Sequence, residues 1–232
     1  MYILHIETST AVCSVALSQD RTLVAFQDME EGMNHTARLA PAISELLHTA
    51  SIKPTDLGAI AVSLGPGSYT GLRVGSSTAK AMAYSLDIPI IAVPTLLSLA
   101  SAVFDKYPEA VYALPMIDAR RKEVYTALYD RALNPVWPVS SAILEESFFA
   151  EKVPGEVIVY SCGDGSLKIG DVVPTGINLK IDPAIMCSGR HLINPALDLW
   201  AKGLVEDPIH FVPYYLKPPN ITQPRNLAPE GR

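Results

Sequence analysis

Two carboxylates, Glu7 and Asp118, each follow a short apolar run and precede a polar turn and an alternating segment. Such a run is typical of a buried strand, so each carboxylate is expected at a strand end. Two carboxylates brought together there would suit a hydrated Mg²⁺ ion. They could equally be ordinary turn carboxylates, and the residues alone leave both interpretations open. The repeated pattern also suggests a duplicated structural unit.

Residues 63–80 form the most glycine-rich stretch and lie between a predicted strand and a predicted helix. Glycine in such a place indicates close approach of the backbone to a phosphate, to another part of the fold or to another chain. A Walker A loop needs four residues between its glycines and a lysine after the second. Here five residues separate Gly65 from Gly71, and Leu72 and Arg73 follow. The GxGxxG pattern fails as well, so no known phosphate loop is matched.

Small residues recur at every fourth position of the helix predicted for residues 71–86, namely Gly71, Gly75, Ala79 and Ala83. A row without bulk lets another element approach closely along one face of the helix. The row either packs against the protein's own sheet or faces a partner subunit. Both alternatives remain open at this point.

Metal binding and nucleophilic catalysis have little basis in the residues. No two of the five histidines lie four residues apart on a helix, and the position four residues after His35 is Leu39. Ser68 lacks the GxSxG elbow, and Cys13 has no assigned base. We therefore predict no catalytic residue and no metal site.

Composition excludes several classes of protein. The 232 residues are 49 % hydrophobic and 18 % charged, which is typical of a globular protein. The net charge of −6 argues against this chain alone gripping a nucleic-acid backbone. Three cysteines without a CxxC pair indicate buried, reduced thiols. No signal peptide and no membrane helix are recognised, so we expect a cytoplasmic protein with no membrane partner.

Hydrophobic periodicity predicts a mixed sheet covered by helices, with a lobe boundary near residue 105. The first lobe, residues 1–104, is expected to hold strands at 2–7, 12–17, 23–27, 57–63 and 89–93 and helices at 35–50, 71–86 and from Thr95. The second lobe, residues 105–232, is expected to hold strands at 111–117, 123–129 and 156–161, short and long helices at 145–151 and 189–203, and an extended proline-rich tail. Residues 131–155 are otherwise predicted to be loops.

Five motifs together resemble the bacterial TsaB (YeaZ) family: IETST at 6–10, LGPGSYTGLRVG at 64–75, AKAMAY at 79–84, IDAR at 117–120 and EVY at 123–125. The resemblance covers about residues 1–130 and continues more thinly through CGDG at 162–165 and VPYYL at 212–216. It implies an α/β fold of the actin-like ATPase (ASKHA) class with two ribonuclease-H-like lobes, which agrees with the suspected duplication.

The resemblance further implies a non-catalytic subunit in the threonylcarbamoyl modification of adenosine in tRNA. Its expected partners are a TsaD-like catalytic paralogue, a TsaE-like ATPase, a second copy of itself when alone, and tRNA only through the complex. The paralogue carries an HxxxH motif where this chain has His35 and Leu39, so the metal-dependent chemistry is not expected here. Because members of the family pair through the first two helices, the expected interface comprises His35, Leu39, Gly71, Gly75, Ala79 and Ala83.

The fold class also implies ATP or ADP with Mg²⁺, either at a degenerate site near Glu7 and Asp118 or at a subunit interface. Glu7 stands where family members more often have aspartate, which counts against carrying this ligand over. The alternative function is an autonomous ATP-dependent phosphotransferase that uses these two carboxylates. The M22 peptidase label of some family members finds no support in the residues.

Overall fold

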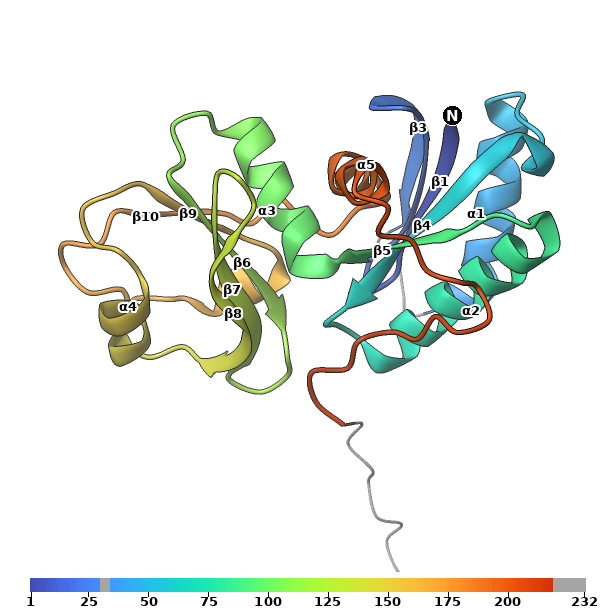
Figure 1. The fold of residues 1–232 in the computed structure, drawn as a ribbon. Helices are drawn as coiled ribbons and strands as arrows, with labels where there is room; N and C mark the ends of the chain where they lie inside the picture. The colour runs from blue at the N-terminus through green and yellow to red at the C-terminus, as the bar shows by residue number, and fades with distance from the viewer. Residues whose placement is uncertain (30–33, 219–232) are drawn as a thin grey trace, which may run out of the picture.

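The computed structural model describes residues 1–29 and 34–218, arranged as two halves that each contain one five-stranded sheet (Figure 1). No helix in these two ranges is both long and apolar enough to cross a membrane. The predicted tail prolines Pro219, Pro224 and Pro229 lie outside the described residues.

The first sheet has the strand order β3-β2-β1-β4-β5. Its strands are β1 (Tyr2–Glu7), β2 (Cys13–Gln19), β3 (Thr22–Met29), β4 (Leu57–Gly65) and β5 (Ile90–Pro94). The first three strands form an antiparallel meander, and β4 and β5 run parallel to β1. Helices α1 (His35–Thr49) and α2 (Tyr69–Leu86) cover one face of this sheet.

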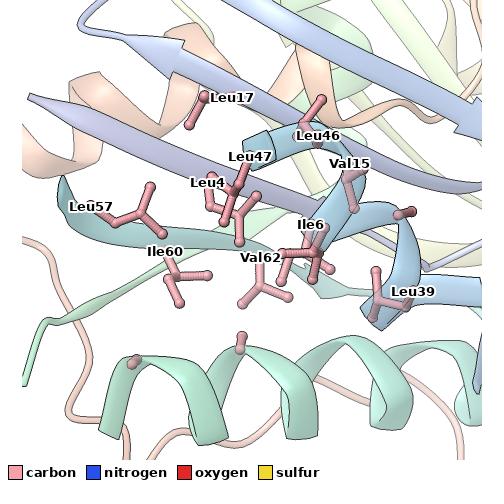
Figure 2. Packing of buried hydrophobic residues seen from close by; sticks show 14 of the residues in the cluster. Leu4, Ile6, Val15, Leu17, Leu39, Leu46, Leu47, Leu57, Ile60 and Val62 are labelled. Atoms are coloured by element: carbon pink, nitrogen blue, oxygen red, sulfur yellow. The ribbon is translucent and has the colours of Figure 1, made fainter. Parts of the chain in front are cut away.

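The alternation of β1 divides the apolar residues between the two faces of the sheet. Leu4 and Ile6 point toward α1 and α2, where they join a cluster with Leu39 and Val62 (Figure 2). Ile3 points to the opposite face, which is covered by the short 3-10 helix η3 (Gly189–Leu192) and by α5 (Ile193–Ala201). The central strands β1 and β4 are therefore buried on both faces, whereas the edge strand β3 is largely exposed.

The second sheet repeats the topology of the first, because its order β8-β7-β6-β9-β10 again places a meander beside two parallel strands. Its strands are β6 (Tyr112–Asp118), β7 (Glu123–Asp130), β8 (Pro135–Ile143), β9 (Val159–Cys162) and β10 (Leu179–Asp182). The short helix α4 (Glu146–Lys152) packs on it through Phe149. The duplication suspected from Glu7 and Asp118 is thus present in the whole topology.

The chain passes between the two halves more than once. Helix α3 (Thr95–Lys106) spans the predicted boundary at residue 105, and its buried leucines pack with the second sheet. Helix α5, late in the sequence, packs on β5 of the first sheet. The division into residues 1–104 and 105–232 therefore stays a prediction. Segments before residue 105 pack on the second sheet, and segments after it pack on the first.

Three local predictions need correction. The segment predicted as loop contains β8, an edge strand that tolerates Pro135 and Pro138 because one side of an edge strand has no partner to bond. Strand β10 was not predicted. The helix expected at residues 189–203 is a 3-10 turn followed by α5, with Pro195 in the first turn of α5, where a missing N–H costs little.

One proline and the segment after residue 210 also differ from what the sequence pattern alone indicates. Helix α1 starts at His35 and continues through Pro41, which lies on its exposed side. The segment after residue 210 is extended, but Phe211 is buried in the core beneath α2. The Tyr214 N–H donates to the Leu64 carbonyl at 2.8 Å, so this segment is fixed to the first half.

Candidate functional site

The glycine-rich turn between β4 and α2 is occupied by the chain's own backbone. The Ser68 N–H donates to the Ser9 carbonyl at 2.6 Å, and a Cβ at Gly67 would overlap that same carbonyl oxygen. Ser68 also caps α2, since its hydroxyl accepts from the Gly71 N–H at 3.2 Å. The Ser68 N–H holds the turn against the segment that follows β1, and the Gly71 N–H is bonded to the Ser68 hydroxyl. Neither amide is available to bind a phosphate.

The inner row of α2 faces the protein's own sheet. A Cβ at Gly71 would overlap the Thr8 carbonyl oxygen, and a Cβ at Gly75 would overlap the Thr8 hydroxyl. Ala79 and Ala83 are fully buried in the core of the first half. In Figure 2, the side chains drawn on α2 are short and point toward the strand that carries Ile60 and Val62. The row from Gly71 to Ala83 therefore packs against the protein's own sheet.

The remaining residues of the expected interface are buried as well. His35 is 7 % exposed, and its Nε2 lies 3.0 Å from the Thr10 carbonyl oxygen. Leu39 is 1 % exposed and packs in the core. In this chain His35, Leu39, Gly71, Gly75, Ala79 and Ala83 are buried and hold α1 and α2 on the sheet, so none of them presents an exposed side chain, and their role in an interface stays a prediction.

The opposite sides of the same two helices form a groove of about 380 Å³. It is lined by Ala40 and Ile43 of α1 and by Ser77, Thr78, Ala81 and Met82 of α2. None of these six side chains is charged, and five of them reach solvent. Small residues in such a place allow close approach of another helix. Sequence contained a signal for this face, because Ser77, Ala81 and Ser85 form a second row at the same four-residue spacing.

Glu7 lies at the end of β1 and is fully buried. Its Oε1 accepts from the Ser9 N–H at 2.7 Å, whereas Oε2 has no hydrogen-bond partner. Burial raises the pKa of this carboxyl, against the opposing effect of its hydrogen bonds. The Ser9 hydroxyl meets Cys187 at 3.9 Å, and the Gly189 N–H donates to the Ser14 hydroxyl, so residues 187–189 lie over this end of the sheet.

Asp118, the counterpart of Glu7 in the second half, is exposed. Its carboxylate accepts from Lys168 Nζ at 2.6 Å and from the Arg120 N–H. The Asp118 N–H donates to Asp164 at 2.9 Å, and burial raises the pKa of that neighbouring carboxyl. Asp118 is therefore a turn carboxylate that already has a cationic partner.

These surroundings do not fit Mg²⁺ with a nucleotide at Glu7 and Asp118. A cation site needs ionised carboxylates that face a common space. Burial favours the neutral form of Glu7, and a lysine neutralises Asp118. Within residues 1–29 and 34–218, no group of three or more His, Cys, Asp or Glu side chains is placed to hold a metal ion.

Comparisons with known proteins point in one direction. A sequence model of the TsaD family, described as tRNA N6-adenosine threonylcarbamoyltransferase, matches residues 30–141. The chain is 32 % identical to the tRNA threonylcarbamoyladenosine biosynthesis protein TsaB of Escherichia coli, over 94 % of this chain and 95 % of that protein. It is 37 % identical to the TsaB protein of Bacillus subtilis, over 75 % of this chain and 78 % of the relative.

Solved structures agree with the sequence relatives. YeaZ from Pseudomonas aeruginosa superimposes with a TM-score of 0.81 at 26 % identity, covering 93 % of this chain and 99 % of that chain. Component A of the (R)-2-hydroxyglutaryl-CoA dehydratase of Acidaminococcus fermentans gives a TM-score of 0.51 at 11 % identity, covering 87 % of this chain and 98 % of that chain. The second likeness concerns the fold alone, in which two mixed sheets are covered by helices.

Proposed function

The chain belongs to the TsaB family and acts in tRNA threonylcarbamoyladenosine biosynthesis, and on that premise we propose that it is a non-catalytic assembly subunit that pairs with a TsaD-like paralogue. A TsaE-like ATPase joins the assembled pair, and tRNA meets the chain within that complex. When the paralogue is absent, a second copy of this chain takes its place.

The groove between α1 and α2 is the observation that carries the proposal. Its lining is uncharged and mostly small, so a helix pair from a partner can pack closely and bury apolar surface there. The partner face therefore consists of Ala40, Ser77, Thr78, Ala81 and Met82, in place of the buried row on the other side of α2. We call this face the α1/α2 groove.

The state of the chemistry-bearing residues supports a non-catalytic role. Glu7 is sealed from solvent, and Ser68 is engaged as a helix cap. Cys13 is buried, and burial raises the pKa of its thiol to about 11, which disfavours the reactive thiolate. The phosphotransferase alternative would need Glu7 and Asp118 to share a cation, and nothing in their surroundings favours it.

Co-elution with the paralogue tests the proposal. The chain is mixed with a TsaD-like protein and analysed by size exclusion and native mass spectrometry. Ala81→Arg places a bulky charge in the α1/α2 groove and is expected to abolish the complex. Ala150→Arg, on the exposed side of α4 in the second half, is the matched control and should bind like the parent.

The fold of each variant is checked by circular dichroism and thermal melting. Complex formation by Ala81→Arg at the parent's affinity would contradict the assignment of the groove. Calorimetry with Mg-ATP, on the isolated chain and on the assembled pair, separates the nucleotide questions. Heat of binding by the isolated chain would favour the phosphotransferase alternative, and binding only by the pair would place a nucleotide at the interface.

A further inference from the structure

The turn between β6 and β7 holds two arginines in an unfavourable backbone conformation. Arg120 has φ 70° and Arg121 has φ 52°, in the left-handed region that suits glycine or asparagine. A side chain with a Cβ disfavours this conformation because the Cβ approaches the following carbonyl oxygen. The Ala119 N–H donates to the Glu123 carbonyl at 3.1 Å and the Glu123 N–H to the Arg120 carbonyl at 3.2 Å, which close the turn. The turn thus carries two arginines in a backbone conformation that suits other residue types better.

Positive charge at this turn is not neutralised by the rest of the chain. Arg120, Arg121 and Lys122 are exposed, and none of them forms an ion pair within the described part of the chain. The adjacent carboxylates are already engaged: Asp118 pairs with Lys168, and Glu123 pairs with Lys217.

The pairing with Lys217 also places the turn beside the end of the described chain. Figure 1 shows the red C-terminal segment running past α2 toward the half that contains β6 and β7. Within an acidic protein of net charge −6, the turn is therefore a local cationic tip.

We propose that this tip, residues 119–123, binds the phosphate backbone of the tRNA on which the complex acts. The proposal rests on the proposed function, because it assumes that the chain meets tRNA within the assembled complex. Exposed guanidinium and ammonium groups neutralise phosphates and release counterions, and such contacts position an RNA without reading its sequence. Two or three contacts are too few to bind RNA alone, which agrees with the acidic character of the whole chain.

A protein partner is the less suitable occupant of this tip. Protein interfaces have an apolar core, whereas the tip presents three consecutive cationic side chains between Ala119 and Glu123, which is paired with Lys217. The uncharged α1/α2 groove belongs to the first half of the molecule, whereas the tip belongs to the second sheet. The two surfaces can therefore serve two different kinds of partner.

The test uses Arg120→Asn with Arg121→Gly, because asparagine and glycine tolerate the left-handed backbone and the turn keeps its shape. Arg120→Lys with Arg121→Lys preserves the charge. Lys152→Gln with Lys202→Gln removes two exposed charges elsewhere and serves as the matched control. Fluorescence anisotropy of a labelled, unmodified tRNA transcript is measured with the chain and the TsaD-like paralogue mixed, over a range of salt concentrations.

We expect the Asn-Gly variant to bind the transcript about tenfold more weakly, with the slope of log K against log salt reduced by about 1 to 2. Its melting temperature should equal or exceed that of the parent, because the turn is relieved. The lysine variant and the control variant should stay close to the parent. Unchanged affinity and slope in the Asn-Gly variant would overturn the proposal.

Loss of co-elution with the paralogue in the Asn-Gly variant would also overturn it, because the tip would then be a protein contact. If the parent chain itself does not co-elute with the paralogue, the proposed function fails instead. The inference about the tip then falls with its premise, because contacts as few as these cannot bind RNA without the rest of the complex.

Discussion

Glu7 is a carboxylic acid at the end of β1, where the surrounding chain buries it completely. Its neighbours are backbone amides, serines and Cys187, and one of its oxygens has no partner. In such a place the neutral acid is favoured because a buried charge loses its hydration. The residue is therefore a structural acid whose ionisation opposes folding.

A pH dependence follows from the raised pKa of Glu7. Between its pKa in the unfolded chain and its higher pKa in the folded protein, the native state binds more protons, so raising the pH lowers stability. Glu7→Gln keeps an acceptor for the Ser9 N–H and cannot ionise. We expect the variant to match the parent near pH 4 and to exceed it in free energy of unfolding at pH 7 to 8, measured by urea denaturation.

The difference between the two proteins isolates Glu7 from other titrating groups. Burial lowers the pKa of His5 to about 3 and that of His191 to about 4, so both destabilise the folded protein as the pH falls below their unfolded values. These contributions are common to both proteins and cancel in the difference. Parallel curves from pH 4 to 8 would show that the Glu7 carboxyl is not perturbed.

At the scale of elements, helix α2 carries two rows of small residues with the same four-residue spacing, one buried and one facing outward. One side carries the buried row from Gly71 to Ala83, and the other carries Ser77, Ala81 and Ser85. The inner row lets the helix axis approach Thr8, whose hydroxyl donates to the Gly71 carbonyl at 2.8 Å. The outer row faces away from the sheet, and in the function proposed above it is the part of α2 that meets a partner.

Gly75→Ala tests the inner side of α2. Alanine favours a helix by about 1 kcal/mol over glycine, but its Cβ would overlap the Thr8 hydroxyl. We expect a net loss of about 2 kcal/mol in the free energy of unfolding, as in other overpacked cores. Ser77→Ala on the exposed side of the same helix is the control, and its stability should change by less than about 0.5 kcal/mol. Equal stability of the two variants would contradict the packing described.

At the scale of the whole molecule, the first half depends on residues from the end of the chain. Leu192 and Ala196 cover the face of the first sheet that carries Ile3, Ala61 and Ile91. Phe211 fills the core on the opposite side. We therefore do not expect residues 1–104 and 105–232 to fold independently of each other.

Expression of residues 1–104 alone tests this dependence. The fragment would expose one apolar face of its sheet, so we expect no cooperative thermal transition and rapid proteolysis. The full chain should melt cooperatively and resist protease under the same conditions. A fragment with a sharp transition and near-UV circular dichroism like that of a packed core would contradict the prediction.

Sequence by itself determined most of the strands and helices, the duplication and the family. Alternating apolar residues and the motif at residues 64–75 carry that information locally, because strand formation and glycine turns depend on neighbours in the chain. The same local rules missed β8 and β10. An edge strand with prolines is recognised only by the strand beside it, since its own pattern is that of a loop.

Only the tertiary structure decided which side of α2 is buried and what state the carboxylates have. Both rows of small residues satisfy the same helical spacing, and the position of Thr8 on the neighbouring segment is what selects the inner one. Likewise, Glu7 and Asp118 follow equivalent strands, but residues 187–189 bury the first and Lys168 pairs with the second. The burial of Glu7 and the ion pair of Asp118 depend on residues far away in the sequence, and a local sequence pattern carries no information about them.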